Sequence, residues 1–357
     1  MKAIIVAAGR FDQEMVQKIA AGREPRLDVF ELQTALDSGA RKVDFIDVES
    51  SKRPDVQAVR KALGLSAAVA YLAFVERGDA DAFFTTGEDI GLPLTMLLKL
   101  RRVRASHTMI AHTLAPTKKR IFFKAGAGSR LDKVLCYAST EERLMLDQLG
   151  MAPRAVQRFN YHADENFFRP MPEVAEEPDL ICAAGQLLRD YDTLVRATRD
   201  LPVRVRIAAG SPWIAKDMKP TEALPANVEW QKYNRFDLRN LYARSAIAVV
   251  PLHQNVYQTG ISTILEMMAM GKCVIATRTH GQVDTIVDNV TGVYVPPGDA
   301  AALRAAIQRL LASPADRQRI GRAARAFIEK EAGLDLFTDK CVAAMKDAHA
   351  ARFGGTA

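Results

Sequence analysis

The sequence predicts an α/β protein made of two doubly wound domains. At 357 residues, the chain is too long for one comfortable core and suits two domains of ordinary size. Short apolar runs also alternate with helix-like stretches, which indicates parallel sheets covered by helices on both faces. Two such domains that face each other leave a cleft at the carboxyl ends of their sheets, where open α/β folds bind ligands.

The first half supplies short apolar runs that we interpret as strands. Each run alone is ambiguous between a strand and a buried helix segment, so the alternation carries the assignment. The strand runs cover residues 3–8, 43–48, 82–85 and 108–111, and the helix-like stretches include residues 56–62 and 92–100.

The second half shows the same alternation more clearly. Its predicted strands cover residues 180–184, 203–209, 228–232, 247–252, 273–277 and 292–295, with helices at 191–198, 238–244, 263–270 and 284–287. Asp299 is expected to cap a helix that runs to residue 311, and the Ser313-Pro314 step separates it from a helix at about 315–331.

A segment rich in proline and acidic residues, FFRPMPEVAEEPD, separates the halves. Proline at this density breaks helices and suits an extended connection. We therefore place the first domain at residues 1–168, a linker at 169–178 and the second domain at 179–334. A C-terminal helix of about residues 335–350 can pack back onto the first domain.

Composition is that of an ordinary globular protein, with 48% apolar and 25% charged residues, which disfavours disordered and fibrous classes. The four cysteines are far apart, so neither a disulfide framework nor a zinc site follows, and a reducing cytoplasm is expected. The start, MKAIIVAAGRFDQ, suits a buried strand better than a signal peptide. Nothing approaches eighteen consecutive apolar residues, so no spanning helix is expected.

The net charge of +7 is concentrated between residues 99 and 133. A solvated face is the simplest interpretation. Docking of this run on anionic lipid at the inner membrane face, or on an acidic acceptor, is the main alternative. Nucleic acid is disfavoured, because no recognised motif or aromatic platform interleaves the charges. The run comprises Lys99, Arg101, Arg102, Arg104, Lys118, Lys119, Arg120, Lys124, Arg130 and Lys133, against Asp132 alone.

The stretch VPLHQNVYQTGISTILEMMAMG, residues 250–271, combines a strand end, a loop with Gly260 and a helix start. Ser262 or Thr263 is expected to cap that helix and leave backbone N–H groups pointed into the loop. Such a junction is a ready anion site, most naturally for a phosphate.

Residues suited to transfer from a sugar nucleotide lie around this loop. The reaction has an oxocarbenium-like transition state, and the departing diphosphate needs cations and N–H donors. Glu266, about one turn into the helix, is placed to reach a ribose, although a Glu there also complements the helix dipole. Arg189 is expected to point its guanidinium across the cleft, or else to pair with Asp190 or Asp192 on the surface.

Other motifs are weak or absent. His112 ends the 108–111 run, and a lone histidine is more often structural than functional. The remaining histidines do not group by spacing, so no metal site is proposed. Gly9-Arg10 follows the first strand without a GxGxxG pattern, which disfavours a dinucleotide dehydrogenase.

Part of the second half resembles a known protein family. ILEMMAMGKCVIATRTHGQVDTIVDNVTGVYVPPGDAAALRAAI resembles the C-terminal domain of retaining glycosyltransferases of family 4 (glycosyl transferases group 1), which have the GT-B fold. LRNLYARSAIAVVPL is similar to the helix and strand before it, and YHADENFFRP to the segment that closes the first domain. The resemblance covers most of residues 161–331 and is mainly architectural over residues 1–160.

The family motif has two glutamates separated by seven residues, and the resemblance makes Glu266 the second of them, the ribose ligand. Gln258 stands at the first position, where a neutral amide can still bond a sugar hydroxyl with about half the strength of a carboxylate. This departure bears on which sugar is carried. The resemblance places the diphosphate and sugar against Thr259, Gly260, Ile261, Ser262 and Thr263.

Elsewhere the resemblance implies further site residues. Gln186 stands where the family usually has an arginine, and Arg189 takes the position of its lysine, so one cation replaces two. His112 aligns with a histidine that these enzymes place near the donor sugar, and Gly9 is assigned to the donor site. No protein nucleophile is implied.

The resemblance implies a metal-independent retaining glycosyltransferase that uses a UDP- or GDP-sugar type of donor and needs no cofactor. Its acceptor is unidentified and can be a glycan, a lipid-linked molecule or a small molecule. The alternatives are a nucleotide-sugar epimerase or hydrolase on the same fold, and a non-catalytic relative that binds sugar nucleotides.

Overall fold

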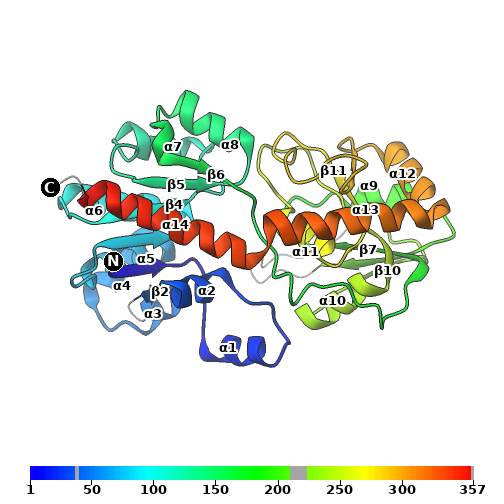
Figure 1. Cartoon of the computed structure of the whole chain (residues 1–357), viewed down its shortest axis with the longest axis horizontal. Helices are drawn as coiled ribbons and strands as arrows, with labels where there is room; N and C mark the ends of the chain where they lie inside the picture. Colours follow the sequence, from blue (N-terminus) through cyan, green and yellow to red (C-terminus); the bar gives the residue numbers. More distant parts are fainter. Residues whose placement is uncertain (37–39, 210–222, 355–357) are drawn as a thin grey trace. The chain divides into compact units, whose positions relative to one another are not determined.

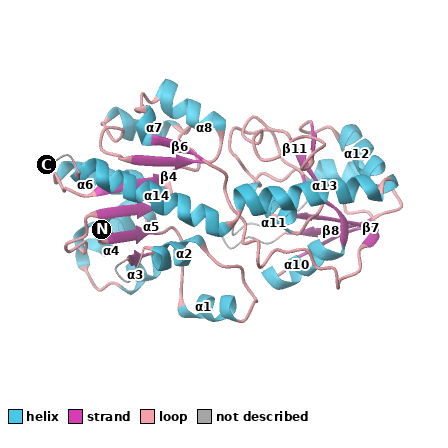
Figure 2. Ribbon diagram, viewed as in Figure 1, coloured by secondary structure: helices cyan, strands magenta, loops and turns pink. Residues whose placement is uncertain are grey.

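The computed structural model describes residues 1–36, 40–209 and 223–354. It divides into two compact units (Figure 1). The first comprises residues 1–17, residues 26–159 and the chain from residue 335 onward. The second comprises residues 18–25 and 160–334. Each unit has strands in its middle and helices around them (Figure 2), which confirms the predicted doubly wound α/β class.

A parallel sheet with strand order β2-β1-β3-β4-β5-β6 forms the middle of the described part of the first unit. The order reverses between β1 and β3, which makes this a topological switch point. The strands are β1 (Ala3–Val6), β2 (Arg41–Val43), β3 (Ala82–Thr85), β4 (Ser106–Ile110), β5 (Lys133–Cys136) and β6 (Val156–Arg158).

The helices of this part of the chain include two that the apolar pattern predicts, α4 (Pro54–Leu63) and α6 (Glu88–Leu100). The helix before β3, α5 (Leu65–Val75), packs against α6, the helix after β3. The remaining helices are α1 (Gln13–Ala20), which crosses from the first unit into the second, α2 (Asp28–Ala35), α3 (Phe45–Ser50), α7 (Thr117–Lys124) and α8 (Ser139–Arg143).

The predicted strand at residues 43–48 is wrong. Only Val43 belongs to a strand, and α3 begins two residues later. Asp44 accepts a hydrogen bond from the N–H of Ile46, and Asp47 accepts one from the N–H of Asp44. This capping box satisfies N–H groups at a helix start. The two acidic side chains therefore start a helix here, although the apolar residues between them predicted a strand.

The last helix, α14 (Leu334–Phe353), belongs to the first unit from Asp335 onward. The Phe337 ring packs 5.4 Å from the Phe159 ring. Near its end, Arg352 Nη2 lies 2.7 Å from Asp132 Oδ1. The helix expected at about residues 335–350 is therefore part of the first unit's own packing.

The described part of the second unit has a parallel sheet with strand order β12-β11-β10-β7-β8-β9. Its strands are β7 (Glu177–Ala184), β8 (Arg204–Ala208), β9 (Val228–Gln231), β10 (Ser245–Val250), β11 (Val274–Thr277) and β12 (Val293–Val295), and each corresponds to a predicted strand. Its helices are α9 (Tyr191–Thr198), α10 (Arg235–Arg244), α11 (Ile261–Ala269), α12 (Ala300–Ala312) and α13 (Pro314–Phe327), followed by a π-helical turn at Ile328–Ala332.

Side chains of β7 alternate between two cores. Ile181 and Ala183 lie in the core beneath α9 and α12, while Leu180 and Cys182 lie in the core beneath α10 and α11. A strand buried on both faces is expected at the centre of a parallel sheet. The predicted Asp299 cap is confirmed, since its side chain accepts from the Ala302 N–H at 2.8 Å.

The predicted helix at residues 284–287 is wrong, because side chains bind the N–H groups that a helix would use. Val287 donates its N–H to Thr291 Oγ1 at 2.9 Å, and Ile286 donates to the Tyr294 hydroxyl at 3.3 Å. Such side-chain acceptors compete with helical hydrogen bonds.

The division between the units falls at residues 159 and 160, before the segment 169–178 that the sequence predicts as a linker. That segment packs within the second unit, where Met171 and Val174 contact its core. Proline content therefore marks an extended stretch, and burial decides to which unit it belongs. Among the helices that the structure describes, none is long and apolar enough to cross a membrane.

Candidate functional site

The loops that follow β7 and β10 meet at the switch point of the second sheet. β7 and β10 are neighbouring strands, and their following helices, α9 and α11, pack on opposite faces. The two loops pair through their backbones: Asp190 N–H donates to Pro251 O at 3.1 Å, and His253 N–H donates to Leu188 O at 3.0 Å. Ligands of open α/β sheets bind at such a point.

Arg189 lies inside this junction. The residue is only 6% exposed. Its Nε donates to Ala184 O at 2.9 Å and its Nη1 to Leu187 O at 3.0 Å. Its Nη2 donates to Thr263 Oγ1 at 3.1 Å. Burial lowers the pKa of the guanidinium, and Tyr191, Tyr242 and Glu266 oppose that shift.

The guanidinium of Arg189 is buried inside the second unit, so the expectation that it points across the cleft is wrong. The alternative expectation, a surface pairing with Asp190, does not occur either. The Asp190 side chain instead caps α9, where it accepts from the Thr193 N–H at 3.0 Å and from the Thr193 hydroxyl at 2.7 Å. The guanidinium joins the end of β7, its own loop and the start of α11. It is therefore placed to hold the junction together.

The start of α11 has no side-chain cap, so the predicted capping by Ser262 or Thr263 is wrong. Gly260 is the N-cap residue, in a left-handed conformation with φ of 80°. Thr263 Oγ1 is occupied by Arg189, and Ser262 is exposed. Without a capping side chain, the first-turn N–H groups of α11 keep their capacity for an anion.

Glu266 is buried behind this helix start, 7% exposed. Its Oε1 accepts from Arg235 Nη1 at 2.8 Å and its Oε2 from the Tyr242 hydroxyl at 3.4 Å. Burial raises the pKa of Glu266, and the charge of Arg235 opposes that rise. Glu266 lies beyond the first turn of α11, so a role for the helix dipole alone does not account for its position.

Sequence reasoning missed Arg235 and Tyr242, although their spacing carries a signal. Seven residues apart in α10, they lie on one face of the helix, two turns from each other. A buried carboxylate requires a partner, but the sequence does not show that α10 packs beside Glu266, 24 to 31 residues further along the chain.

Gln258 and Thr259 join a chain of polar contacts with the segment that follows β11. Gln258 Nε2 donates to Thr285 Oγ1 at 3.3 Å, and the Thr285 hydroxyl donates to Gln282 Oε1 at 2.8 Å. Gln282 Nε2 then donates to Thr259 O at 3.4 Å. A carboxylate at position 258 has no proton to donate to Thr285, so the amide suits this network.

Gln186 lies in the loop after β7 and is 3% exposed. Its Oε1 has no hydrogen-bond partner among the described residues. Ile261 is half-buried and packs against the core beneath α11. Thus Gln186, Arg189, Glu266 and the loop 258–263 belong to one unit and lie around the β7–β10 switch point.

His112 and Gly9 belong to the first unit, where Thr86 links their loops. The Ala8 N–H donates to Thr86 Oγ1 at 3.1 Å, and His112 Nε2 lies 2.9 Å from Thr86 O. A carbonyl oxygen only accepts, so the proton of a neutral His112 is assigned to Nε2 and the lone pair to Nδ1. The sequence carried no signal for Thr86.

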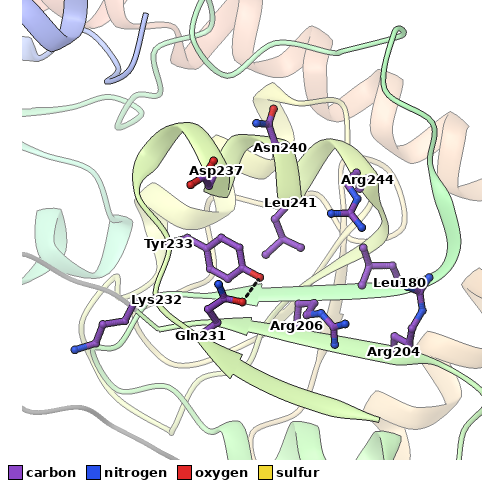
Figure 3. A pocket seen from close by; sticks show the side chains of 10 residues that line it. All are labelled: Leu180, Arg204, Arg206, Gln231, Lys232, Tyr233, Asp237, Asn240, Leu241 and Arg244. Carbon is purple, nitrogen blue, oxygen red and sulfur yellow. Dashed lines mark hydrogen bonds between the residues drawn. The ribbon is translucent and has the colours of Figure 1, made fainter.

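A separate pocket of about 370 Å³ lies beside α10 and contains none of the predicted site residues. Figure 3 shows Tyr233 bonded to Gln231 at its wall, with arginines reaching in from β8 and α10. Each of those arginines pairs with a carboxylate: Arg204 with Asp179, Arg206 with Glu229 and Arg244 with Glu177. The pocket is lined by Leu180, Arg204, Arg206, Gln231, Lys232, Tyr233, Asp237, Asn240, Leu241 and Arg244.

Metal-binding clusters are not found in the described ranges, where no three His, Cys, Asp or Glu residues gather in a suitable group. The cysteines described by the structure are buried and free of disulfides: Cys136, Cys182, Cys273 and Cys341.

Residues 164–327 match the family model of the glycosyl transferases group 1. A D-inositol 3-phosphate glycosyltransferase from Saccharomonospora viridis is 27% identical over 280 residues, which cover 65% of this chain and 64% of that protein. A glycogen synthase from Mycobacterium tuberculosis is 30% identical over 113 residues, or 32% of this chain and 27% of that enzyme. The matched region thus spans less than two thirds of the length of either relative.

Solved structures resemble the chain over nearly its full length. A glycosyltransferase from Rickettsia africae aligns with a TM-score of 0.70 at 17% identity, covering 97% of this chain and 98% of that one. A sucrose-phosphate synthase from Thermosynechococcus elongatus aligns with a TM-score of 0.72 at 16% identity, covering 98% of this chain and 100% of that one. Anabaena HepE in complex with UDP and glucose aligns with a TM-score of 0.70 at 13% identity, covering 97% of this chain and 99% of that one. This likeness shows that the chain has the GT-B fold.

The role of Arg189 in the junction predicts the effect of Gly185→Ala. Gly185 has φ of 93°, and a Cβ there would lie 2.3 Å from Arg189 Nη2. Gly298 has φ of 69° with open space around it, so Gly298→Ala is a matched control that carries only backbone strain, about 1–2 kcal/mol. Gly185→Ala should lower the free energy of unfolding in urea by a further 1–3 kcal/mol or so, because buried bonds to a charged group are displaced. Equal losses in the two variants would contradict this role.

Proposed function

We propose that this chain, which has the GT-B fold and whose residues 164–327 match the family model of the glycosyl transferases group 1, transfers a sugar from a nucleotide-diphosphate donor to an acceptor. The observation that carries the proposal is the junction at the start of α11. It combines an uncapped helix start at Gly260 with the buried carboxylate of Glu266 in the same helix, inside the residues that match the family.

In the proposed reaction, the first-turn N–H groups of α11 stabilise charge that grows on the departing diphosphate. Backbone dipoles already aimed at that charge need no reorganisation as the bond breaks. Ser262 is exposed in this first turn, where its hydroxyl can add a further donor. Arg189 supports the site indirectly, because its guanidinium bonds Thr263 in that turn.

Glu266 is proposed to accept a hydrogen bond from the ribose of the donor. It lies five residues after Ile261 in α11, about 8 Å along the axis at 1.5 Å per residue. Ribose and diphosphate are adjacent groups of a nucleotide, so one molecule can reach both. Arg235 favours the ionised form of Glu266, which is the better acceptor.

Nucleotide binding is the first test. If the proposal holds, at least one of UDP, GDP, ADP and dTDP should raise the melting temperature, because a ligand that binds only the folded state stabilises it. UDP is tested first, because the structurally similar protein HepE was crystallised in complex with UDP. Glu266→Gln, which keeps the shape of the side chain, should lose most of the shift, whereas the exposed Glu173→Gln should keep it. No shift with any of the four nucleotides would sink the proposal.

We further propose that transfer retains the anomeric configuration and needs no divalent metal, as the resemblance implies. With a UDP- or GDP-sugar donor and a panel of acceptors, proton NMR should show a product with the donor's anomeric configuration, and EDTA should leave the rate unchanged. A product with inverted anomeric configuration contradicts retention. A transfer rate that falls in EDTA contradicts metal independence. Epimerised donor, or free sugar without acceptor, identifies the epimerase or hydrolase alternative, and binding without turnover identifies a non-catalytic relative.

We also propose that the basic run contacts anionic lipid, through fewer residues than its charge suggests. Lys119 is buried against Glu88, and Arg130 is buried and bonds Val103 O and Ala105 O. Two apolar side chains in the same stretch are exposed, Leu100 by 72% and Ile121 by 60%. The exposed cations are Arg101, Arg102, Arg104, Lys118 and Lys124.

Liposome flotation checks this surface. Binding should require anionic lipid and weaken with salt, because exposed charges are screened. Lys118→Glu with Lys124→Glu should abolish flotation, and Lys61→Glu, an exposed lysine in α4, should leave it intact. Flotation that is independent of anionic lipid, or equally lost in both variants, would remove the membrane proposal.

A further inference from the structure

The loop that carries His112 rests on a buried cluster of charged side chains in the first unit. Glu88 begins α6, Lys119 lies in α7 and Glu141 lies in α8. They are 3%, 7% and 8% exposed, respectively. Charged residues so deeply buried need partners, and the loop between β4 and α7 supplies many of them.

Consecutive backbone N–H groups of this loop donate to the two carboxylates. The His112 N–H donates to Glu88 Oε2 at 2.9 Å and the Thr113 N–H to Glu88 Oε1 at 3.2 Å. The Leu114 N–H donates to Glu141 Oε1 at 2.5 Å. Bonds to ionised acceptors are about twice as strong as neutral ones, so the carboxylates restrain the main chain at all three residues.

Lys119 supplies the positive charge of the cluster. Its Nζ lies 2.5 Å from Glu88 Oε1 and 3.1 Å from Asp89 Oδ1. Burial by itself lowers the pKa of Lys119, but the charges of Glu88 and Asp89 outweigh burial and raise it. Lys119 therefore keeps its charge, and Glu88 is held in a pair while it binds the loop.

Glu141 is the member of the cluster that changes charge near neutral pH. Burial raises the pKa of Glu141 to about 7, and the negative charge of Glu88 adds to this rise. The hydrogen bond from the Leu114 N–H and the positive charge of Lys119 oppose the rise. α8 also packs against β6 and against the π-helical turn Leu144–Gln148 that follows α8. Their charged groups are exposed: Arg158, which bonds Glu142, and Asp147.

We propose that Glu88, Lys119 and Glu141 are positioning residues for His112. They hold the backbone of residues 112–114 so that the imidazole donates from Nε2 to Thr86 O and presents its Nδ1 lone pair to a hydroxyl group of the ligand. The consequence for catalysis rests on the proposed function. The conformation of residues 112–114 and the tautomer of the His112 ring do not depend on it.

The test measures the ring of His112 in the full chain without substrate. Long-range proton–nitrogen NMR, assigned with His112→Gln, should show the Nε2–H form for neutral His112 in the wild type. In Glu88→Gln an NH2 group replaces one of the two acceptor oxygens and faces either the His112 N–H or the Thr113 N–H with Lys119, so the ring nitrogens should shift toward a mixture of both tautomers. Glu142→Gln, which lies beside Glu141 in α8 but pairs at the surface with Arg158, should match the wild type.

Glu141→Gln is a milder second variant if Glu88→Gln does not fold. The Leu114 amide proton should titrate with a midpoint near pH 7 in the wild type, following Glu141, and this step should vanish in Glu141→Gln. A raised carboxyl pKa favours folding at low pH, and that stability is lost as pH rises through about 7. The wild-type melting temperature should therefore fall more than that of Glu141→Gln between pH 5 and 8.

The proposal is overturned if the folded variants give the wild-type result. That result is unchanged chemical shifts of the His112 ring nitrogens in Glu88→Gln, together with an unchanged titration of the Leu114 amide proton in Glu141→Gln. A lower melting temperature of both variants would not rescue it. If the shifts respond but the wild type transfers no sugar, the positioning stands and the proposed function fails. If transfer occurs, Glu88→Gln should lower kcat by about tenfold to a hundredfold, as expected for a misplaced group, while Glu142→Gln keeps the wild-type value.

Discussion

A buried guanidinium holds together the part of the second unit on which its site depends. Arg189 has five N–H donors in a rigid plane, and a cation removed from water requires acceptors for them. It finds these acceptors at the end of β7, in its own loop and at Thr263. Two strands with helices on opposite faces are thus joined at their carboxyl ends. Space for the side chain comes from Gly185 and Gly260, where a Cβ would approach the guanidinium.

In the first unit, buried carboxylates hold a loop in place, whereas a buried guanidinium does so in the second unit. The carboxylates accept from loop N–H groups, whereas Arg189 donates to loop carbonyls. Loops at the ends of parallel strands cannot satisfy their backbone groups by sheet pairing, and burial makes unsatisfied groups costly. Buried charge restrains these loops in both units. Other side chains of these segments, such as His112 and Ser262, remain exposed.

Most of the sheet was predictable because parallel strands buried on both faces read as continuous apolar runs. The sequence did not predict β5 and β6, and two further errors fall where polar side chains take over backbone groups. Asp44 and Asp47 start a helix inside an apolar run, and Thr291 takes an N–H that the expected helix at 284–287 needs. These bonds depend on side-chain oxygens at short range, which hydrophobic periodicity does not register.

The candidate site was predictable in part. The loop 258–263, Glu266 and Arg189 were found from strand–loop–helix order and from the family pattern, both of which are local in sequence. Their partners were not: Arg235 lies 31 residues from Glu266, and Arg189 lies 74 residues from Thr263. Contacts at such separations depend on which elements pack together.

By itself, therefore, the sequence determined the alternation of strands and helices, the α/β class and the loop–helix junction that bears the family pattern. Tertiary structure alone decided that Arg189 turns inward, that Arg235 and Tyr242 bind Glu266, and that Thr86 orients His112. The physical reason is burial. Periodicity and turn chemistry act between near neighbours, whereas a charge that leaves water takes whichever partner the packed elements bring within hydrogen-bond distance.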